Sequence, residues 1–294
     1  MKSRISIHFD GPIAKDHTVQ LRTFSKTLTN IQTAIDRAYL DVKYGSIWKN
    51  ARLKADDYAD TDFLLEQTRE GGFIADLIGG GKSSDIVGRI HQAVMPAYEQ
   101  ARAPVPVEQE KLVDQAEVRR KHYNAGAQRP ATFEELVERP NPALARAYGD
   151  RSIVKEFDQI ASAIRARHND GSLVEIDLHA GRALPRFVFD HSTASAFHEV
   201  VSVRTLGDLV EIPVTLRALD SGNGGISKAK AYNRISKKEF NLHIHTDRGF
   251  SSLRKYLKKR NPPEFTIIAV PVLEYASFDP MAGDMYFISV AGEE

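Results

Sequence analysis

The fold of this chain is decided by a stretch near its N-terminus, residues 18–42, which reads TVQLRTFSKTLTNIQTAIDRAYLDV. Apolar side chains recur in it at steps of three and four residues, at Leu21, Phe24, Leu28, Ile31, Ile35, Ala38 and Val42. This spacing places them on one face of an α-helix. We therefore expect a long amphipathic helix that packs its apolar face on a sheet.

The residues on either side of this helix predict the sheet. Residues 3–9 alternate Ile5, Ile7 and Phe9 with polar side chains, which indicates a half-buried strand. Two β-like stretches follow the helix, at residues 51–58 and 63–69, before a glycine pair and another apolar run. The sequence thus predicts an N-terminal strand–helix–hairpin unit, followed by further helices, in a mixed α+β fold.

The composition is that of a folded protein. The chain has 294 residues, 42% hydrophobic and 27% charged, which is enough for one large or two ordinary domains. No apolar run is long enough to cross a bilayer, and the N-terminus resembles a strand rather than a secretion signal, so we expect a cytoplasmic protein with no membrane partner. The chain contains no cysteine, which excludes disulfides, thiolate metal sites and cysteine nucleophiles.

Changes in composition divide the chain into three parts. A proline-rich sequence follows residue 103, and the segment from there to residue 150 is charged, helical and interrupted by prolines. After residue 171 strand signals dominate, with strict alternation at residues 240–245. We expect an α+β domain at residues 1–103, a helical connector at 104–150, and a β-rich domain at 151–294 that forms a small barrel of the OB or SH3 kind.

A glycine turn is the first candidate binding site. Between a predicted strand and a predicted helix the chain reads GGGKSS, residues 79–84, and the backbone N–H groups of such a turn can bind phosphate. A nucleotide-hydrolysing P-loop would need glycine where this chain has Asp76. The sequence therefore favours a structural turn, in which a modest anion site would use Gly80, Gly81, Lys82 and Ser83.

Histidines form the second candidate site. His243 and His245 are two residues apart on a predicted strand, so their imidazoles share one face, and Asp247 follows closely. Two imidazoles and a carboxylate can hold a divalent metal. Two histidines on the solvent face of a strand produce the same pattern without a metal. We therefore expect no bound metal or cofactor, and a metal- or acid–base-dependent hydrolase is the alternative.

A basic stripe is the third candidate site. Between residues 228 and 260 the only acidic residues are Glu239 and Asp247. Such a stripe is typical of surfaces that contact a phosphate backbone and stack bases on aromatic rings. A solvated basic face would look the same, and the net charge of +1 is low for a dedicated nucleic-acid binder. The predicted ligand-binding residues are Lys228, Lys230, Tyr232, Arg234, Lys237, Lys238, Arg254, Lys255, Tyr256, Lys258, Lys259 and Arg260.

The turn Glu70-Gly71-Gly72-Phe73, which closes the predicted N-terminal strand–helix–hairpin, resembles a group of uncharacterised bacterial proteins found with anti-phage defence genes. The resemblance extends no further than residue 100 and contains no catalytic motif. It implies a bacterial accessory or sensor protein in a multi-component system.

Together these patterns favour an intracellular binding or accessory protein over an enzyme. Its C-terminal domain would offer a basic surface to nucleic acid or to a nucleotide. Its N-terminal domain would serve self-association into a homo-oligomer or the docking of a protein partner. The alternatives are the hydrolase that uses His243, His245 and Asp247, and a module that binds other proteins only.

Overall fold

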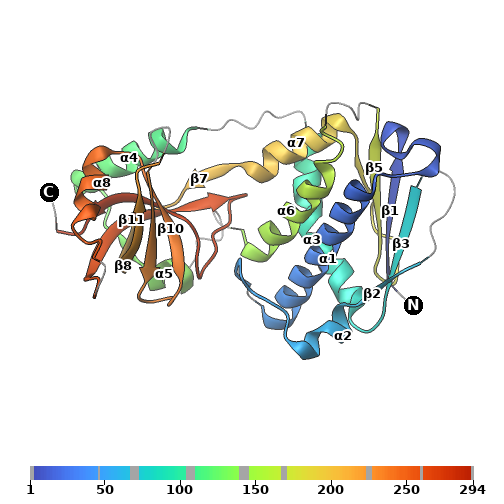
Figure 1. The fold of residues 1–294 in the computed structure, drawn as a ribbon, viewed down its shortest axis with the longest axis horizontal. Helices are drawn as coiled ribbons and strands as arrows, with labels where there is room; N and C mark the ends of the chain where they lie inside the picture. Colours follow the sequence, from blue (N-terminus) through green and yellow to red (C-terminus); the bar gives the residue numbers. More distant parts are fainter. Residues whose placement is uncertain are drawn as a thin grey trace. The chain divides into compact units, whose positions relative to one another are not determined.

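The computed structural model of the chain describes residues 3–45, 47–66, 73–103, 110–138, 146–166, 171–222, 227–258 and 261–292. They form the mixed α+β fold that the sequence predicted (Figure 1). The chain divides into two compact units, the first made of Met1–Val107 with Tyr148–Ser202 and the second of Glu108–Ala147 with Val203–Glu294. Among the described helices, none has the length and apolar character that a membrane span requires.

The first unit is a five-stranded sheet with four longer helices on one face (Figure 1). The strand order is β2-β3-β1-β5-β6, and every neighbouring pair is antiparallel. The strands are β1 (Ser3–Asp10), β2 (Phe63–Leu65), β3 (Phe73–Gly79), β5 (Leu173–His179) and β6 (Phe187–Phe189). The helices are α1 (Leu21–Tyr44), α3 (Ser83–Arg102), α6 (Tyr148–Ala161) and α7 (His191–Ser202), with a short η1 (Gly11–His17) after β1.

Alternation along the strands separates an apolar from a polar face. Ile5, Ile7 and Phe9 of β1 are fully buried, as are Val174, Ile176 and Leu178 of β5. Helix α1 supplies the predicted apolar stripe at Ile31, Ile35 and Ala38, whereas the predicted stripe ends, Leu21 and Val42, are exposed. The intervening strand residues place Arg4, Ser6, His8, Glu175, Asp177 and His179 on the other face of the sheet.

The stretch at residues 51–58 is not the predicted strand. It contains two short helices, η2 (Ala55–Asp57) and α2 (Tyr58–Thr61). The carboxylate of Asp57 accepts the backbone N–H of Lys54 at 2.8 Å and the ammonium of Lys43 at 2.5 Å. A buried aspartate that satisfies a backbone donor stabilises a turn rather than a strand. The turn at residues 70–72, on which the family resemblance depends, lies outside the described residues.

The chain passes between the units at 107/108 and 147/148, close to the predicted boundaries at 103/104 and 150/151, but it passes again after Ser202, and residues 108–147 belong to the second unit rather than to a separate connector. Strand β5 pairs with β1, from Arg4 opposite His179 to Asp10 opposite Leu173, and α6 packs on α1. Residues 148–202 therefore complete the first unit instead of opening the second. Residues 200–202 end helix α7, although strand signals dominate the sequence after residue 171. Composition does not reveal this return because the pairing joins segments far apart in the chain.

The second unit is a closed five-stranded barrel. Its strands are β8 (Val210–Asp220), β9 (Ser227–Asn233), β10 (Glu239–Ile244), β11 (Glu264–Glu274) and β12 (Met285–Val290). Pairing of β11 with β8 closes the ring, and β10 and β12 are parallel whereas the other neighbours are antiparallel. The parallel pair requires a crossover, which runs through α8 (Asp247–Arg254) and β11. This Greek-key arrangement is that of an OB barrel, not of an antiparallel meander.

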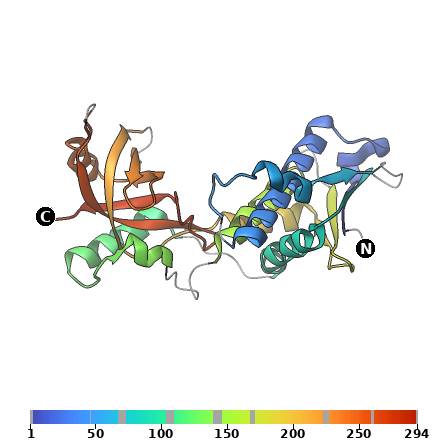
Figure 2. The same cartoon turned by 90° about the horizontal axis from the view of Figure 1, so that it is seen from below.

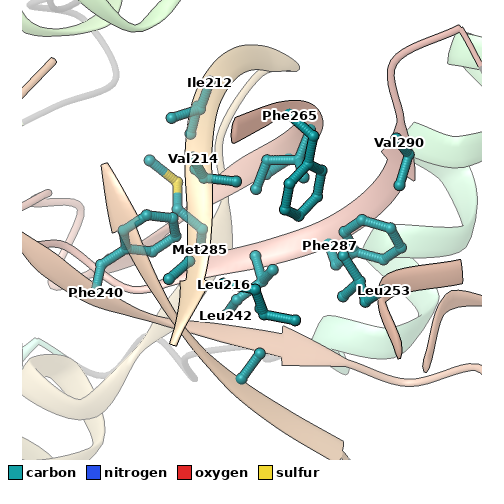
Figure 3. Packing of buried hydrophobic residues seen from close by; sticks show 14 of the residues in the cluster. Ile212, Val214, Leu216, Phe240, Leu242, Leu253, Phe265, Met285, Phe287 and Val290 are labelled. Atoms are coloured by element: carbon teal, nitrogen blue, oxygen red, sulfur yellow. The ribbon is translucent and has the colours of Figure 1, made fainter. Parts of the chain in front are cut away.

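Alternate side chains of these strands fill the barrel (Figure 3). Leu242 and Phe287 are buried inside it, and Leu253 of α8 joins them from outside the strands. Two helices and two short strands flank the barrel: α4 (Leu112–Asn124), α5 (Phe133–Glu138), β4 (Ala131–Thr132) and β7 (Arg204–Leu206). Figure 2 shows α4 and α5 in green beside the strands. Helix α4 covers the outer face of β11 and β12, where Ala116 meets Val270 and Ile288.

Candidate functional site

The outer face of β9 and β10 presents the first part of the predicted basic stripe. Ala229 and Ala231 of β9 are buried in the barrel, so Lys228 and Lys230 point outward and are exposed, and Tyr232 is half-buried. Antiparallel pairing places Lys228 opposite His243, and Lys230 opposite Asn241. We call the surface formed by Lys228, Lys230, Tyr232, Asn241 and His243 the β9–β10 face.

No carboxylate of the described residues neutralises the positive charges of Lys228 and Lys230. Within the described ranges neither Lys228 nor Lys230 forms an ion pair. Asp220 lies opposite Lys228 on β8, but its carboxylate accepts the backbone N–H of Gly222 at 3.0 Å. Asp284 binds Asn241 Nδ2 at 3.1 Å and His243 Nε2 at 3.2 Å. The neighbouring carboxylates thus have other partners.

One end of the face combines an aromatic ring with guanidinium groups. The guanidinium carbon of Arg217 lies 5.2 Å from the centre of the Tyr232 ring, and that of Arg234 lies 5.9 Å from it. Both distances fit cation–π contacts. Arg234 also pairs with Glu264 at 2.8 Å. Positive charge is therefore held beside the only aromatic residue that β9 contributes.

The remaining residues of the stripe lie on other elements. Lys237 and Lys238 are in the turn between β9 and β10, and Arg254, Lys255 and Lys258 are at the end of α8 or just after it. Helix α8 packs against β12 rather than on β9 and β10.

Tyr256, which the sequence offered as a stacking residue, lies on Phe265 with ring centres 3.8 Å apart and 12° between the planes. One face of the Tyr256 ring therefore packs against the core of the barrel. Lys259 and Arg260 lie outside the described residues.

The two histidines of β10 bind different carboxylates. His243 Nε2 is 3.2 Å from Asp284, and His245 Nε2 is 2.5 Å from Glu117 on α4. Neither partner is Asp247, which is exposed in the first turn of α8. In the described part of the chain, no cluster of three or more histidine, aspartate or glutamate residues is arranged to hold a metal ion. The predicted His243, His245 and Asp247 set is thus split between two histidine–carboxylate pairs.

His245 is buried against α4, whose Glu117 binds it from the helix surface. The His245 side chain is 5% exposed, and its ring centre lies 5.2 Å from that of Tyr286. The hydrogen bond from His245 lowers the pKa of Glu117, and burial raises the pKa of Tyr286 to about 12. The Glu117 carboxylate therefore accepts the hydrogen bond that the Nε2–H group of His245 donates. This pair ties α4 to the edge of the β9–β10 face.

A cavity of about 790 Å³ opens between α4, α8 and the end of β12. Arg120 and Tyr123 line it from α4, and Arg248 and Ser252 line it from α8. Its size is within the usual range of small-molecule pockets. The sequence did not reveal Arg120 or Tyr123 as neighbours of the stripe, because they belong to the segment predicted as a connector.

The predicted anion turn lies in the first unit and faces a carboxylate. Lys82 Nζ is 3.7 Å from Asp60, and an Asp60 oxygen lies 3.5 Å from where a Cβ on Gly81 would be. The turn is tight, since a Cβ on Gly79 would come within 2.5 Å of Ser83. The Asp60 carboxylate beside Gly81 and Lys82 opposes the binding of phosphate at this turn. The arrangement agrees with the structural turn that the sequence favoured.

No protein-family model matches this chain. A search of curated proteins found no similar sequence either. The function of the site is therefore argued from its geometry.

Proposed function

We propose that the second unit binds the phosphate backbone of single-stranded nucleic acid through the β9–β10 face. The observation that carries the proposal is the position of Lys228 and Lys230, exposed and two residues apart on one strand. That spacing corresponds to roughly 7 Å along an extended strand. Two ammonium groups in line can follow a single phosphate backbone.

The topology of the barrel supports the same surface. OB barrels bind oligonucleotides on the face of their second and third strands. In this barrel those strands are β9 and β10, because β8 is the first strand of the ring. The exposed lysines and the strand order of the barrel thus both favour the β9–β10 face as the binding surface.

The aromatic groups on this face favour single strands over duplexes. Bases of a single strand are free to stack on side-chain rings, and such stacking tolerates any base. The half-buried ring of Tyr232 lies on the face beside Arg217 and Arg234, and one side of the His243 ring packs on Tyr286 with centres 6.3 Å apart, which leaves its other side for a base. We expect binding with weak sequence preference.

The test is fluorescence anisotropy with labelled single-stranded DNA and RNA oligonucleotides and a duplex of the same sequence, each at several salt concentrations. Each phosphate contact contributes a slope of about −0.7 to a plot of log binding constant against log salt for single strands. Replacing both lysines, in Lys228→Gln/Lys230→Gln, should therefore flatten the slope by about 1.4 and weaken binding.

A matched control removes the same charge elsewhere. Lys255→Gln/Lys258→Gln changes two exposed lysines after α8 and should leave the slope nearly unchanged. Equal losses in the two double variants would show that binding follows total charge and not this face. Affinity no tighter than the ~10⁻⁴ M of weak non-specific association would contradict the proposal altogether.

The other expected roles stay predictions. A part in anti-phage defence depends on the resemblance at residues 70–73 alone, whereas self-association into a homo-oligomer or the docking of a protein partner is an expectation for the N-terminal α+β domain. The hydrolase alternative has no specific observation in its favour, because His243 and His245 pair with separate carboxylates.

A further inference from the structure

A cavity of about 350 Å³ lies in the first unit, at the end of the sheet where β1 begins. Its polar lining residues are Ser3, Arg4, His179 and Arg182. The register of β1 and β5 places Arg4 opposite His179. Gly181, with a φ of 73°, turns the chain directly after β5 and so brings Arg182 to the same cavity. None of the described residues that line this cavity carries a carboxylate.

Arg4 has an unusual partner for a partly buried guanidinium. Its Nη2 lies 3.1 Å from His179 Nε2, and a guanidinium can only donate, so the imidazole nitrogen accepts the hydrogen bond. A neutral acceptor does not compensate the positive charge. Among the described residues, Arg4 and Arg182 form no ion pair with a carboxylate.

The carboxylates on the same face of the sheet have other partners. Asp76 accepts the hydroxyl of Ser6. Asp177 pairs with Arg186 Nε at 2.9 Å. Among the described residues, the positive charges of Arg4 and Arg182 therefore lie at the end of the sheet where β1 begins without a carboxylate partner.

Ser3 also lines the cavity. Alternation along β1 turns its side chain to the face of Ile5 and Ile7, away from Arg4 and His179. The guanidinium groups of Arg4 and Arg182 therefore supply the donors of the cavity.

We propose that this cavity binds a phosphate group, either as free phosphate or as the phosphate of a small phosphorylated metabolite. Two guanidinium groups suit a phosphate because each presents several N–H donors that match its oxygens. The volume is at the small end of the range for ligand pockets. The site lies in the first unit and does not depend on the nucleic-acid proposal.

The experiment is isothermal titration of the full chain with inorganic phosphate at constant ionic strength, with chloride as the reference anion. Arg182→Gln should raise the Kd for phosphate about tenfold or more, since it removes a charge-assisted contact. Arg4→Gln should do the same. The matched control is Arg22→Gln, which removes an exposed guanidinium from α1 of the first unit, away from the residues that line the cavity, and should change the Kd less than twofold.

The fold of each variant is checked by thermal unfolding. Arg182 is exposed, so Arg182→Gln tests the site even where replacement of the half-buried Arg4 destabilises the protein. Titration with glycerol 3-phosphate separates the two sources of ligand, because tighter binding than that of inorganic phosphate indicates a phosphate ester.

Two results would overturn the proposal: no heat from phosphate beyond that from chloride, or equal phosphate binding by Arg182→Gln and the unchanged protein. The variant Lys228→Gln/Lys230→Gln lies in the second unit and should bind phosphate normally. A negative result for the phosphate cavity therefore does not contradict the proposal for the β9–β10 face, and the reverse also holds.

Discussion

Gly149 of α6 offers a sharp test of the packing in the first unit. A Cβ at this position would lie 2.5–2.6 Å from three carboxyl atoms of Asp41. The same carboxylate accepts Arg89 Nε at 2.7 Å, and Arg89 also binds Asp150 at 2.6 Å. These side chains are mostly buried and connect α1, α3 and α6. Gly149→Ala should therefore displace Asp41 and weaken this network.

The size of the effect follows from the distances. Moving the Asp41 carboxylate from 2.5 Å to an ordinary contact at 3.4 Å requires a shift of roughly 0.9 Å, which stretches its 2.7 Å bond to Arg89 beyond hydrogen-bonding range. Loss of a charge-assisted hydrogen bond costs about 1.5–3 kcal/mol. Alanine is favoured over glycine within a helix by about 0.5–1 kcal/mol. The expected net loss of stability is about 0.5–2.5 kcal/mol.

The assay is urea unfolding followed by circular dichroism, with calorimetry to separate transitions of the two units. Gly88→Ala in α3 is the matched control, because a Cβ there meets nothing within 4 Å and the change should stabilise by about 0.5–1 kcal/mol. In Asp41→Ala/Gly149→Ala the clash is absent, so the double variant should be no less stable than Asp41→Ala. A Gly149→Ala protein as stable as the Gly88→Ala protein would refute this reasoning.

Three further predictions concern single side chains. The pKa of Asp57 is lowered to about 2 from its ordinary 3.8, chiefly by the hydrogen bond from Lys43, so its contribution to stability is present above pH 3.8 and is lost as the pH falls towards 2. Thermal midpoints measured across this range should fall less steeply for Asp57→Asn, and parallel curves would contradict the assignment. Leu242→Ala truncates a fully buried side chain inside the barrel and should cost about 2–5 kcal/mol in urea unfolding; a loss below about 1 kcal/mol would argue against the closed core. Tyr286→Phe removes a buried hydroxyl that lacks a hydrogen-bond partner within the described residues, so the midpoint of urea unfolding should stay the same or rise, and a clear fall would reveal a missing contact.

Local patterns predicted individual elements well. The apolar repeat of residues 18–42 produced α1 (Leu21–Tyr44), and the alternation at residues 240–245 produced β10 (Glu239–Ile244). The alternation of Ile5, Ile7 and Phe9 likewise produced β1 (Ser3–Asp10). These features depend on neighbours in the chain, so a sequence pattern is sufficient to indicate them.

Strand-like sequence led to a wrong prediction where a tertiary contact favours helical structure. Residues 51–58 look like a strand, but the buried Asp57 binds Lys54 and Lys43 and holds the segment in helical turns. Residues 200–202 are β-branched or small, yet Val200 and Val201 are buried on α7 of the first unit. Burial against other elements outweighs intrinsic strand preference.

The sequence by itself determined the long helix at residues 18–42 and the strands at residues 3–9 and 240–245, because their apolar periods depend only on neighbours in the chain. The tertiary structure alone decided that β5 returns to β1, that β11 closes the barrel on β8, and that His245 meets Glu117. It also decided that Tyr256 packs on Phe265 while Lys228 and Lys230 remain exposed. The periodicity of a sequence shows which face of a helix or strand is buried, but not which element packs against that face. Partners depend on which surfaces pack together across long separations in the chain.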